Sequence, residues 1–91
     1  MLDIGGEGRY ENAWNLNPRS LKTIGTEKGL AISRHILGRG ECIPLPDGCV
    51  QQIMMERAPL RRAAVFEMVR VIVPAGTIIR GVKAIIPSHQ L

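Results

Sequence analysis

The residues closest to a recognisable chemistry stand at the start of the chain, where an acid precedes three glycines. Asp3 lies in the short stretch Leu2–Ile4, and Gly5, Gly6 and Gly8 follow it. Glycine lets a backbone turn tightly and approach a ligand closely, and an acid beside such a turn accepts hydrogen bonds from backbone N–H groups. The glycines lack the full Gly-x-Gly-x-x-Gly spacing of a dinucleotide-binding turn. They therefore predict a tight turn after a strand more strongly than a phosphate cradle.

The other reactive side chains do not indicate metal binding or hydrolysis. His35, Cys42 and Cys49 are separated by intervals that match no standard zinc-ligand pattern, so we expect buried thiols and a lone histidine. Neither His35 nor His89 has a partner at a spacing diagnostic of a catalytic triad. Glu56 follows a predicted strand and is expected to be a solvated carboxylate. The sequence identifies no catalytic residue.

The elements that would position these residues are short strands and one strong helix. Apolar, β-branched stretches between glycines and prolines predict strands over Leu2–Ile4, Ala13–Leu16, Leu30–Leu37, Cys49–Met55 and Thr77–Ile86, the last as one strand or as two that are broken near Gly81. Leu60–Val73 is predicted to be a helix that begins after a proline and ends at Pro74-Ala75-Gly76. Strand, helix and strand in that order imply a parallel pair joined by a right-handed crossover, so the fold class is α/β.

The segments between these elements are predicted to be irregular, with one exception left open. Ser20–Gly29 is polar and predicts either a loop or one marginal helix, whereas the prolines and Asp-Gly pair of Ile43–Gly48 predict a turn. Between Gly8 and Ala13 there is no room for a crossover helix, since a parallel connection normally needs a dozen or more residues. The pairing of the first two strands therefore stays open.

The predicted helix carries two apolar stripes at a spacing of 3.6 residues per turn. The stripe expected to face the sheet consists of Leu60, Ala64, Met68 and Val71. The second stripe, roughly a third of a turn away, consists of Phe66, Val69 and Val73. The second stripe is covered either by the domain's own loops or by a partner subunit, which would make the protein a homodimer.

Composition limits the possible classes of protein. With 91 residues, 45% hydrophobic and 22% charged, the chain is expected to form a single domain over residues 1–91. No apolar run reaches the roughly 20 residues of a membrane span, and the first residues do not resemble a secretory signal. The chain has two cysteines, which favours a reducing compartment. We therefore expect a cytoplasmic protein that does not bind membranes.

The net charge of +4 is compatible with an anionic ligand, but the basic residues are spread along the chain. The aromatic residues are Tyr10, Trp14 and Phe66, too few for the stacking platform of a single-strand-binding protein. Nucleic-acid binding is therefore disfavoured.

Four segments form an ordered set that covers most of the chain, from Leu2 to about Val82. They are Leu2–Gly8 with its glycine turn, Trp14–Pro18, the Pro-x-Pro-Asp-Gly segment Gly40–Gly48, and the Glu-x-x-Arg-Val segment Glu67–Gly76. In this order they resemble the Rossmann-like S-adenosylmethionine-dependent methyltransferases of the type 11-like group. The resemblance implies a small, mostly parallel sheet with few helices, that is, a shortened methyltransferase core.

The resemblance also implies a cofactor, a substrate class and a set of site residues. In this family S-adenosylmethionine lies in a crevice at the carboxyl ends of the strands, where its methyl group is passed to an aligned acceptor, here a small molecule. The implied cofactor residues are Asp3, Gly5 and Gly6 in the turn, Asn15 at the ribose, and Cys42 with Ile43 beside the adenine.

Five positions depart from the family's pattern. Glu7 replaces the middle glycine of the turn, Asn15 the ribose-binding acid, Arg39 the acid after the third strand, Gln51 the acid after the Pro-Asp turn, and Ala75 a glycine. The resemblance therefore implies either a small methyltransferase or a descendant that has lost catalysis. Two other functions remain possible on the residues alone: a non-catalytic module that dimerises through its helix, and a basic nucleic-acid-binding domain.

Overall fold

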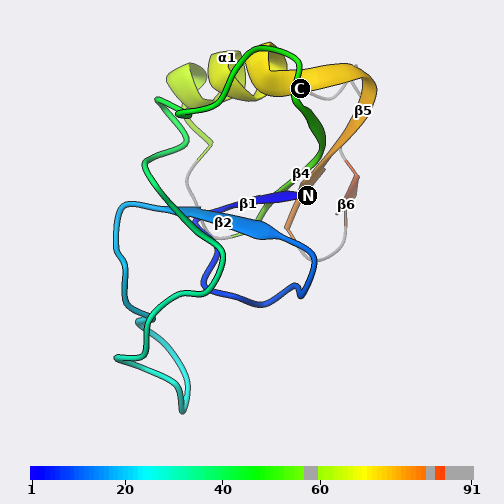
Figure 1. The fold of residues 1–91 in the computed structure, drawn as a ribbon. Helices are drawn as coiled ribbons and strands as arrows, with labels where there is room; N and C mark the ends of the chain where they lie inside the picture. Colours follow the sequence, from blue (N-terminus) through cyan, green and yellow to red (C-terminus); the bar gives the residue numbers. More distant parts are fainter. Residues whose placement is uncertain (57–59, 82–83, 86–91) are drawn as a thin grey trace.

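The protein folds into one mixed sheet with a helix on one face (Figure 1). The computed structural model describes residues 1–56, 60–81 and 84–85. In this part of the chain the elements are β1 (Leu2–Ile4), β2 (Trp14–Asn17), β3 (His35–Leu37), β4 (Val50–Met55), α1 (Arg62–Val71), β5 (Ile72–Arg80) and β6 (Ala84–Ile85). The spatial order of the strands is β3-β2-β1-β4-β5-β6. Strands β1 to β5 are parallel and β6 is antiparallel to β5, which confirms the α/β fold class.

The first two strands pair in parallel despite their short connection. Leu2 lies opposite Trp14, and Asp3 lies opposite Asn15. The nine-residue link between Ile4 and Trp14 contains turns and bends instead of a helix. The pairing of the first two strands, which the sequence left open, is therefore parallel, with an irregular connection between them.

The core lies between α1 and one face of the sheet. Alternate strand residues point to this face, so that Leu2, Leu16 and Ile53 are at most 2% exposed and pack in one cluster with Met68 and Val71 of α1. Figure 1 shows α1 above the sheet and the long loops after β1 and β2 on the other side. The predicted inner stripe of the helix is confirmed for its three members inside α1, namely Ala64, Met68 and Val71.

The helix is shorter than predicted, and this changes the position of Val73. It ends at Val71, because Ile72 is already extended and pairs with Val50 at the start of β5. The register then advances two residues along β4, from Val50 to Gln52, and five along β5, from Ile72 to Thr77. The extra residues form a bulge in which Ala75 has a φ of 65°. Val73 therefore belongs to β5, and the prediction that it extends the helix's outer stripe was wrong.

The third predicted strand is also shorter than expected. Only His35–Leu37 pairs with β2, whereas Ala31 forms an isolated antiparallel bridge with Leu21. Residues 20–29 are a loop with turns, which settles the choice between loop and helix. Of the one or two strands expected over Thr77–Ile86, the structure has two, because β5 ends at Arg80 and β6 begins at Ala84; Ile86 lies outside the described residues.

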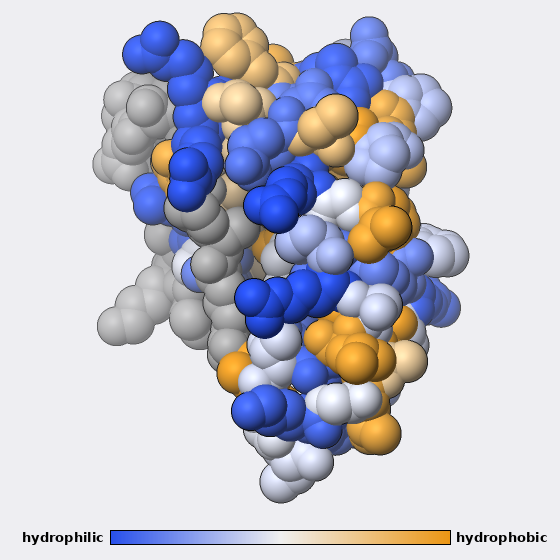
Figure 2. All heavy atoms as spheres, turned by 90° about the vertical axis from the view of Figure 1, so that its left-hand side faces the viewer, coloured by the Kyte–Doolittle hydropathy of each residue, from blue (hydrophilic) through white to orange (hydrophobic). Residues whose placement is uncertain are grey.

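No helix in the described residues is long and apolar enough to cross a membrane. Figure 2 shows one side of the molecule, on which hydrophobic residues form small separate groups among hydrophilic ones.

Candidate functional site

The glycine turn follows β1 directly, as the sequence predicted, and is bonded to its own sheet. Gly5 has a φ of 76°, a left-handed conformation that favours glycine. Its backbone N–H donates to the carbonyl oxygen of Leu16 at 2.7 Å, and that of Gly6 donates to Asp3 at 3.2 Å. Both backbone donors at the carboxyl end of β1 are thus used inside the protein.

Asn15 holds two loops on the sheet face opposite α1. Asn15 is only 1% exposed. The amide oxygen accepts a hydrogen bond from the Gly8 N–H at 3.2 Å, and the amide nitrogen donates to the Ser33 carbonyl at 2.9 Å. The amide that the resemblance assigns to a ribose is therefore engaged with the backbone of the β1–β2 and β2–β3 loops.

Gly6 lies directly against the side chains of Asp3 and Asn15. A Cβ atom at Gly6 would lie 2.4 Å from Asn15 Oδ1 and 2.5 Å from the Asp3 carboxyl carbon. Asp3 is itself 1% exposed and stands opposite Asn15 in the strand register. The structure thus brings Asp3, Gly5, Gly6 and Asn15 together, but as a closed cluster.

The structure places Cys42 and Ile43 on the other side of the sheet. Ile43 is 3% exposed and packs in the core with Leu2 and the residues of α1, whereas Cys42 is exposed. Asp3 and Asn15 alternate with core residues and point away from α1. The six predicted cofactor residues are therefore divided by the sheet and do not line one cleft.

An arginine clamp explains why the Pro-x-Pro-Asp and Glu-x-x-Arg motifs occur together. Arg70 donates to the carbonyl oxygens of Ile43 and Leu45 at 2.8 and 2.9 Å and pairs with Asp47 Oδ1 at 2.7 Å. It also pairs with Glu67 Oε2 at 2.6 Å, and Glu67 Oε1 accepts from the Ile43 N–H at 2.8 Å. The clamp fixes the β3–β4 connection to the helix.

The clamp also sets the charge state of its members. The pKa of Glu67 is lowered, first by the hydrogen bond from Arg70 and then by that from the Ile43 N–H. The pKa of Arg70 is raised by the hydrogen bonds that it donates to Glu67 and Asp47. Both groups are therefore charged at neutral pH, and their contacts indicate a structural role.

Glu56 joins two strands at the carboxyl edge of the sheet. It follows β4, its side chain is 5% exposed, and it accepts hydrogen bonds from Arg9 and Tyr10 of the loop after β1. The prediction of a solvated carboxylate was wrong, because this loop folds back over the end of β4. The strand order reverses direction between β1 and β4, the position where open α/β sheets usually bind ligands. Glu56, Arg9 and Tyr10, here called the Glu56 cluster, occupy this position.

The loops after β1 and β2 border an open hollow of about 460 Å³ whose lining includes Glu7, Arg9, Lys22 and Glu27. Its charges are largely paired within the protein. Lys22 Nζ lies 2.7 Å from Glu27 Oε1, and a Glu7 oxygen accepts from the Thr23 N–H at 2.9 Å. Glu7, which stands where the resemblance expects a glycine, thus anchors the β2–β3 loop.

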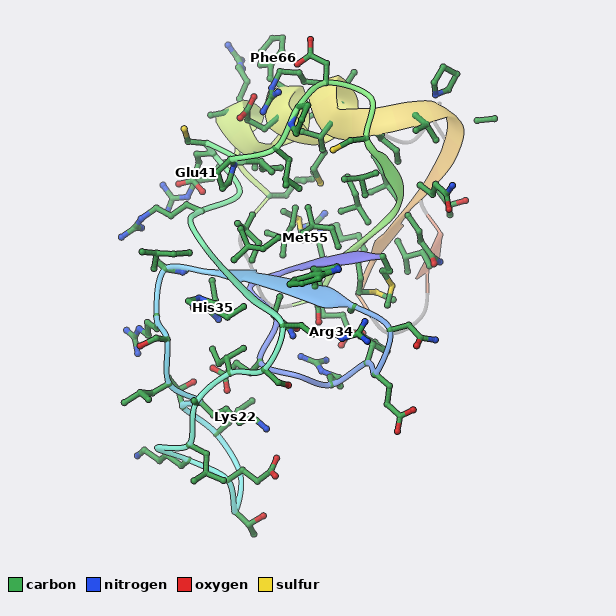
Figure 3. The ribbon with its side chains drawn as sticks, in the orientation of Figure 1. Lys22, Arg34, His35, Glu41, Met55 and Phe66 are labelled. Atoms are coloured by element: carbon green, nitrogen blue, oxygen red, sulfur yellow. The ribbon has the colours of Figure 1, made fainter. Side chains whose placement is uncertain are left out.

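Among the described residues, His35, Cys42 and Cys49 do not gather into a metal site, and His89 lies outside these residues. In residues 1–56, 60–81 and 84–85, no group of three His, Cys, Asp or Glu side chains could hold a metal ion. His35 lies beside β2, with its Nε2 atom 2.8 Å from the Asn17 carbonyl oxygen (Figure 3). Both cysteines are exposed, so the expectation of buried thiols was wrong.

The comparisons with known proteins add no assignment. No family and no curated protein matches this chain. The geometry alone therefore decides how the predicted cofactor residues are interpreted. They do not fit S-adenosylmethionine as arranged, because the Gly5 and Gly6 donors and the Asn15 amide bind the protein itself and the β1–β4 position holds the Glu56 cluster.

Proposed function

We propose that this protein is a degenerate domain of the S-adenosylmethionine-dependent methyltransferase type, which keeps the fold and works without the cofactor and without catalysis. The observation that carries the proposal is the closed glycine turn at the end of a central parallel strand.

The sheet supports the methyltransferase part of the proposal. Its first five strands follow the order 3-2-1-4-5 of a doubly wound nucleotide-binding sheet. The glycine turn follows β1, at the central position where such folds approach a nucleotide. The motif-bearing segments Ile43–Gly48 and Glu67–Arg70 also contact each other through the arginine clamp.

The contacts at the turn support the loss of catalysis. A cofactor would need backbone N–H groups and a polar side chain that are free to receive it. The N–H groups of Gly5 and Gly6 instead donate to backbone carbonyls of the sheet, and the Asn15 amide bonds to the backbone of two loops. Opening the turn would break these hydrogen bonds.

Titration with S-adenosylhomocysteine tests the proposal. A bound ligand raises the melting temperature by mass action, by an amount that grows with ligand concentration. We expect no saturable rise up to about 1 mM ligand, a concentration at which an affinity of about 10 µM would add roughly 2.7 kcal/mol. An active methyltransferase measured in parallel is the positive control. A saturable rise would overturn the loss of cofactor binding.

A second candidate function is self-association through α1, and the exposed side chains of the helix favour it. Phe66 is 70% exposed and Val69 60% exposed, and both line a hollow of about 580 Å³ together with Arg62 and Val65. Phe66 projects from the outer side of the helix in Figure 3, and Figure 2 shows hydrophobic residues at the top of the molecule, over α1. Val73 does not share this surface, because it lies in β5. We propose a homodimer in which α1 packs against its copy.

Sedimentation of the Phe66→Ser variant tests the dimer. Aromatic anchors dominate interface energies, so we expect self-association to weaken about tenfold or more. Leu37→Ser is the matched control, because Leu37 is 68% exposed at the edge strand β3. Equal effects of the two substitutions, or a wild-type protein that stays monomeric at high concentration, would contradict dimerisation through α1.

A further inference from the structure

A second cavity lies at the amino-terminal edge of the sheet, opposite the edge that carries the glycine turn. Its volume is about 430 Å³, within the range of small-molecule sites. Leu2, Trp14 and Val50, at the start of β1, β2 and β4, contribute to its lining. The rest of its mainly apolar lining consists of Met1, Ile36, Leu45, Cys49 and Gln51. Nothing in the proposed function uses this cavity.

Trp14 gives the cavity an aromatic surface. Trp14 is 50% exposed, although it stands next to Asn15 and Leu16, which are each 1% exposed. The ring therefore presents a broad apolar face that the described residues leave in contact with solvent. Flat aromatic ligands gain both buried area and favourable ring stacking on such a surface.

Arg34 adds a positive charge beside this ring. Its guanidinium carbon lies 5.9 Å from the centre of the Trp14 ring, within the distance of a cation–π contact. Among the described residues, no carboxylate forms an ion pair with Arg34. The charge is thus available to an anion bound against the indole.

The backbone of Arg34 is held in an unusual conformation. Its φ is 46°, a left-handed value that is rare for a residue with a side chain. The Arg34 carbonyl accepts a hydrogen bond from the Asn15 N–H at 2.8 Å, which fixes this conformation to β2. Figure 3 shows Arg34 immediately before His35, on the segment that runs beside β2. The Arg34 backbone is therefore held by a hydrogen bond from β2 and by β3, which begins at the next residue.

From these observations we propose that the cavity binds a planar aromatic molecule that carries one anionic group. The ring system lies against Trp14 and the aliphatic wall, and the anion pairs with Arg34. The chain's positive net charge adds a weak general attraction for such a ligand.

Two matched probes test the ligand class. They are 8-anilinonaphthalene-1-sulfonate and N-phenyl-1-naphthylamine, which has the same rings without the sulfonate. Trp14 is the chain's single tryptophan, so quenching of its fluorescence measures the affinity of each probe, and the variants and thiol protection below locate the site. We expect the sulfonate to bind about tenfold more tightly than the neutral probe, a difference of about 1.4 kcal/mol, because a hydrogen bond between two charged groups is stronger than one between neutral groups. Equal affinities would overturn the role of the anion.

Variants identify the residues that bind the probe. Arg34→Gln should remove the preference for the sulfonate, and Trp14→Ala should weaken both probes about tenfold, followed by probe fluorescence. Arg39→Gln, which removes the same charge from an exposed position, should leave both affinities unchanged. If Arg39→Gln and Arg34→Gln reduce binding equally, the attraction is only the general charge and the proposed pairing is wrong.

Thiol protection tests the same site in the unaltered protein. Cys49 lines the cavity and Cys42 does not, while both are exposed to reagents. Saturating sulfonate should slow alkylation of Cys49 by iodoacetamide at least threefold and leave Cys42 unchanged, as measured by peptide mass spectrometry. If the probe slows alkylation of both cysteines by the same factor, or of neither, the proposed placement of the ligand is wrong.

Discussion

Replacing Met68 with alanine is expected to lower the free energy of unfolding by about 2–5 kcal/mol, the usual cost of truncating a buried methionine. Met68 is 2% exposed and packs in the core cluster with Ala64, Val71 and the central strands. Truncation removes buried apolar area and leaves a cavity, because the short strands around it are fixed by their hydrogen bonds. In a domain of this size such a loss is a large part of the total stability.

The neighbouring residue of the same helix is the matched control. Val69 is 60% exposed, so Val69→Ala should change the free energy of unfolding by about 0.5 kcal/mol or less. Urea unfolding of both variants measures the difference, at protein concentrations low enough that no dimer forms. Similar losses for the two variants would mean that the outer stripe of α1 is packed against the protein itself, which would also contradict the proposed dimer surface.

The order of the predicted strands and helix gave the α/β class, and local periodicity predicted the helix's inner stripe. The 3.6-residue spacing of Ala64, Met68 and Val71 reports directly which side of α1 faces the core. The glycine turn after Leu2–Ile4 was likewise visible, because Gly5 adopts a left-handed φ that few other residues accept. Such features depend on neighbouring residues alone.

The contacts that decide the function depend on residues far apart in the chain. Glu56 follows its strand as a lone carboxylate, and no local pattern shows that Arg9 and Tyr10, more than 40 residues earlier, reach it. Whether Asn15 faces a ligand or the Gly8 backbone depends on a parallel register that the short β1–β2 link left open. The end of α1 was misplaced for the same reason, since Ile72 leaves the helix to pair with Val50.

Replacing Gly6 with alanine is expected to destabilise the fold by about 1–3 kcal/mol, as overpacking of a closed interior does. The added methyl would overlap the Asn15 amide and the Asp3 carboxylate, both in strands held by the sheet ladder. The same substitution has a different consequence if the turn is an open cofactor cradle. A methyl in an open cradle occupies solvent, so it would impair ligand binding and leave the unfolding free energy nearly unchanged.

A double-mutant cycle with Asn15→Ala separates the two arrangements. Asn15→Ala removes one of the two obstructing side chains, so Gly6→Ala should cost less in that background than in the wild type, and the two effects should not add. Chemical unfolding of the four proteins gives the coupling energy. Strict additivity, or a Gly6→Ala protein as stable as the wild type, would show that Asn15 does not close the turn. Either result would contradict the proposed loss of cofactor binding, because the space that Asp3 and Asn15 fill in the structure would then be free for a ligand.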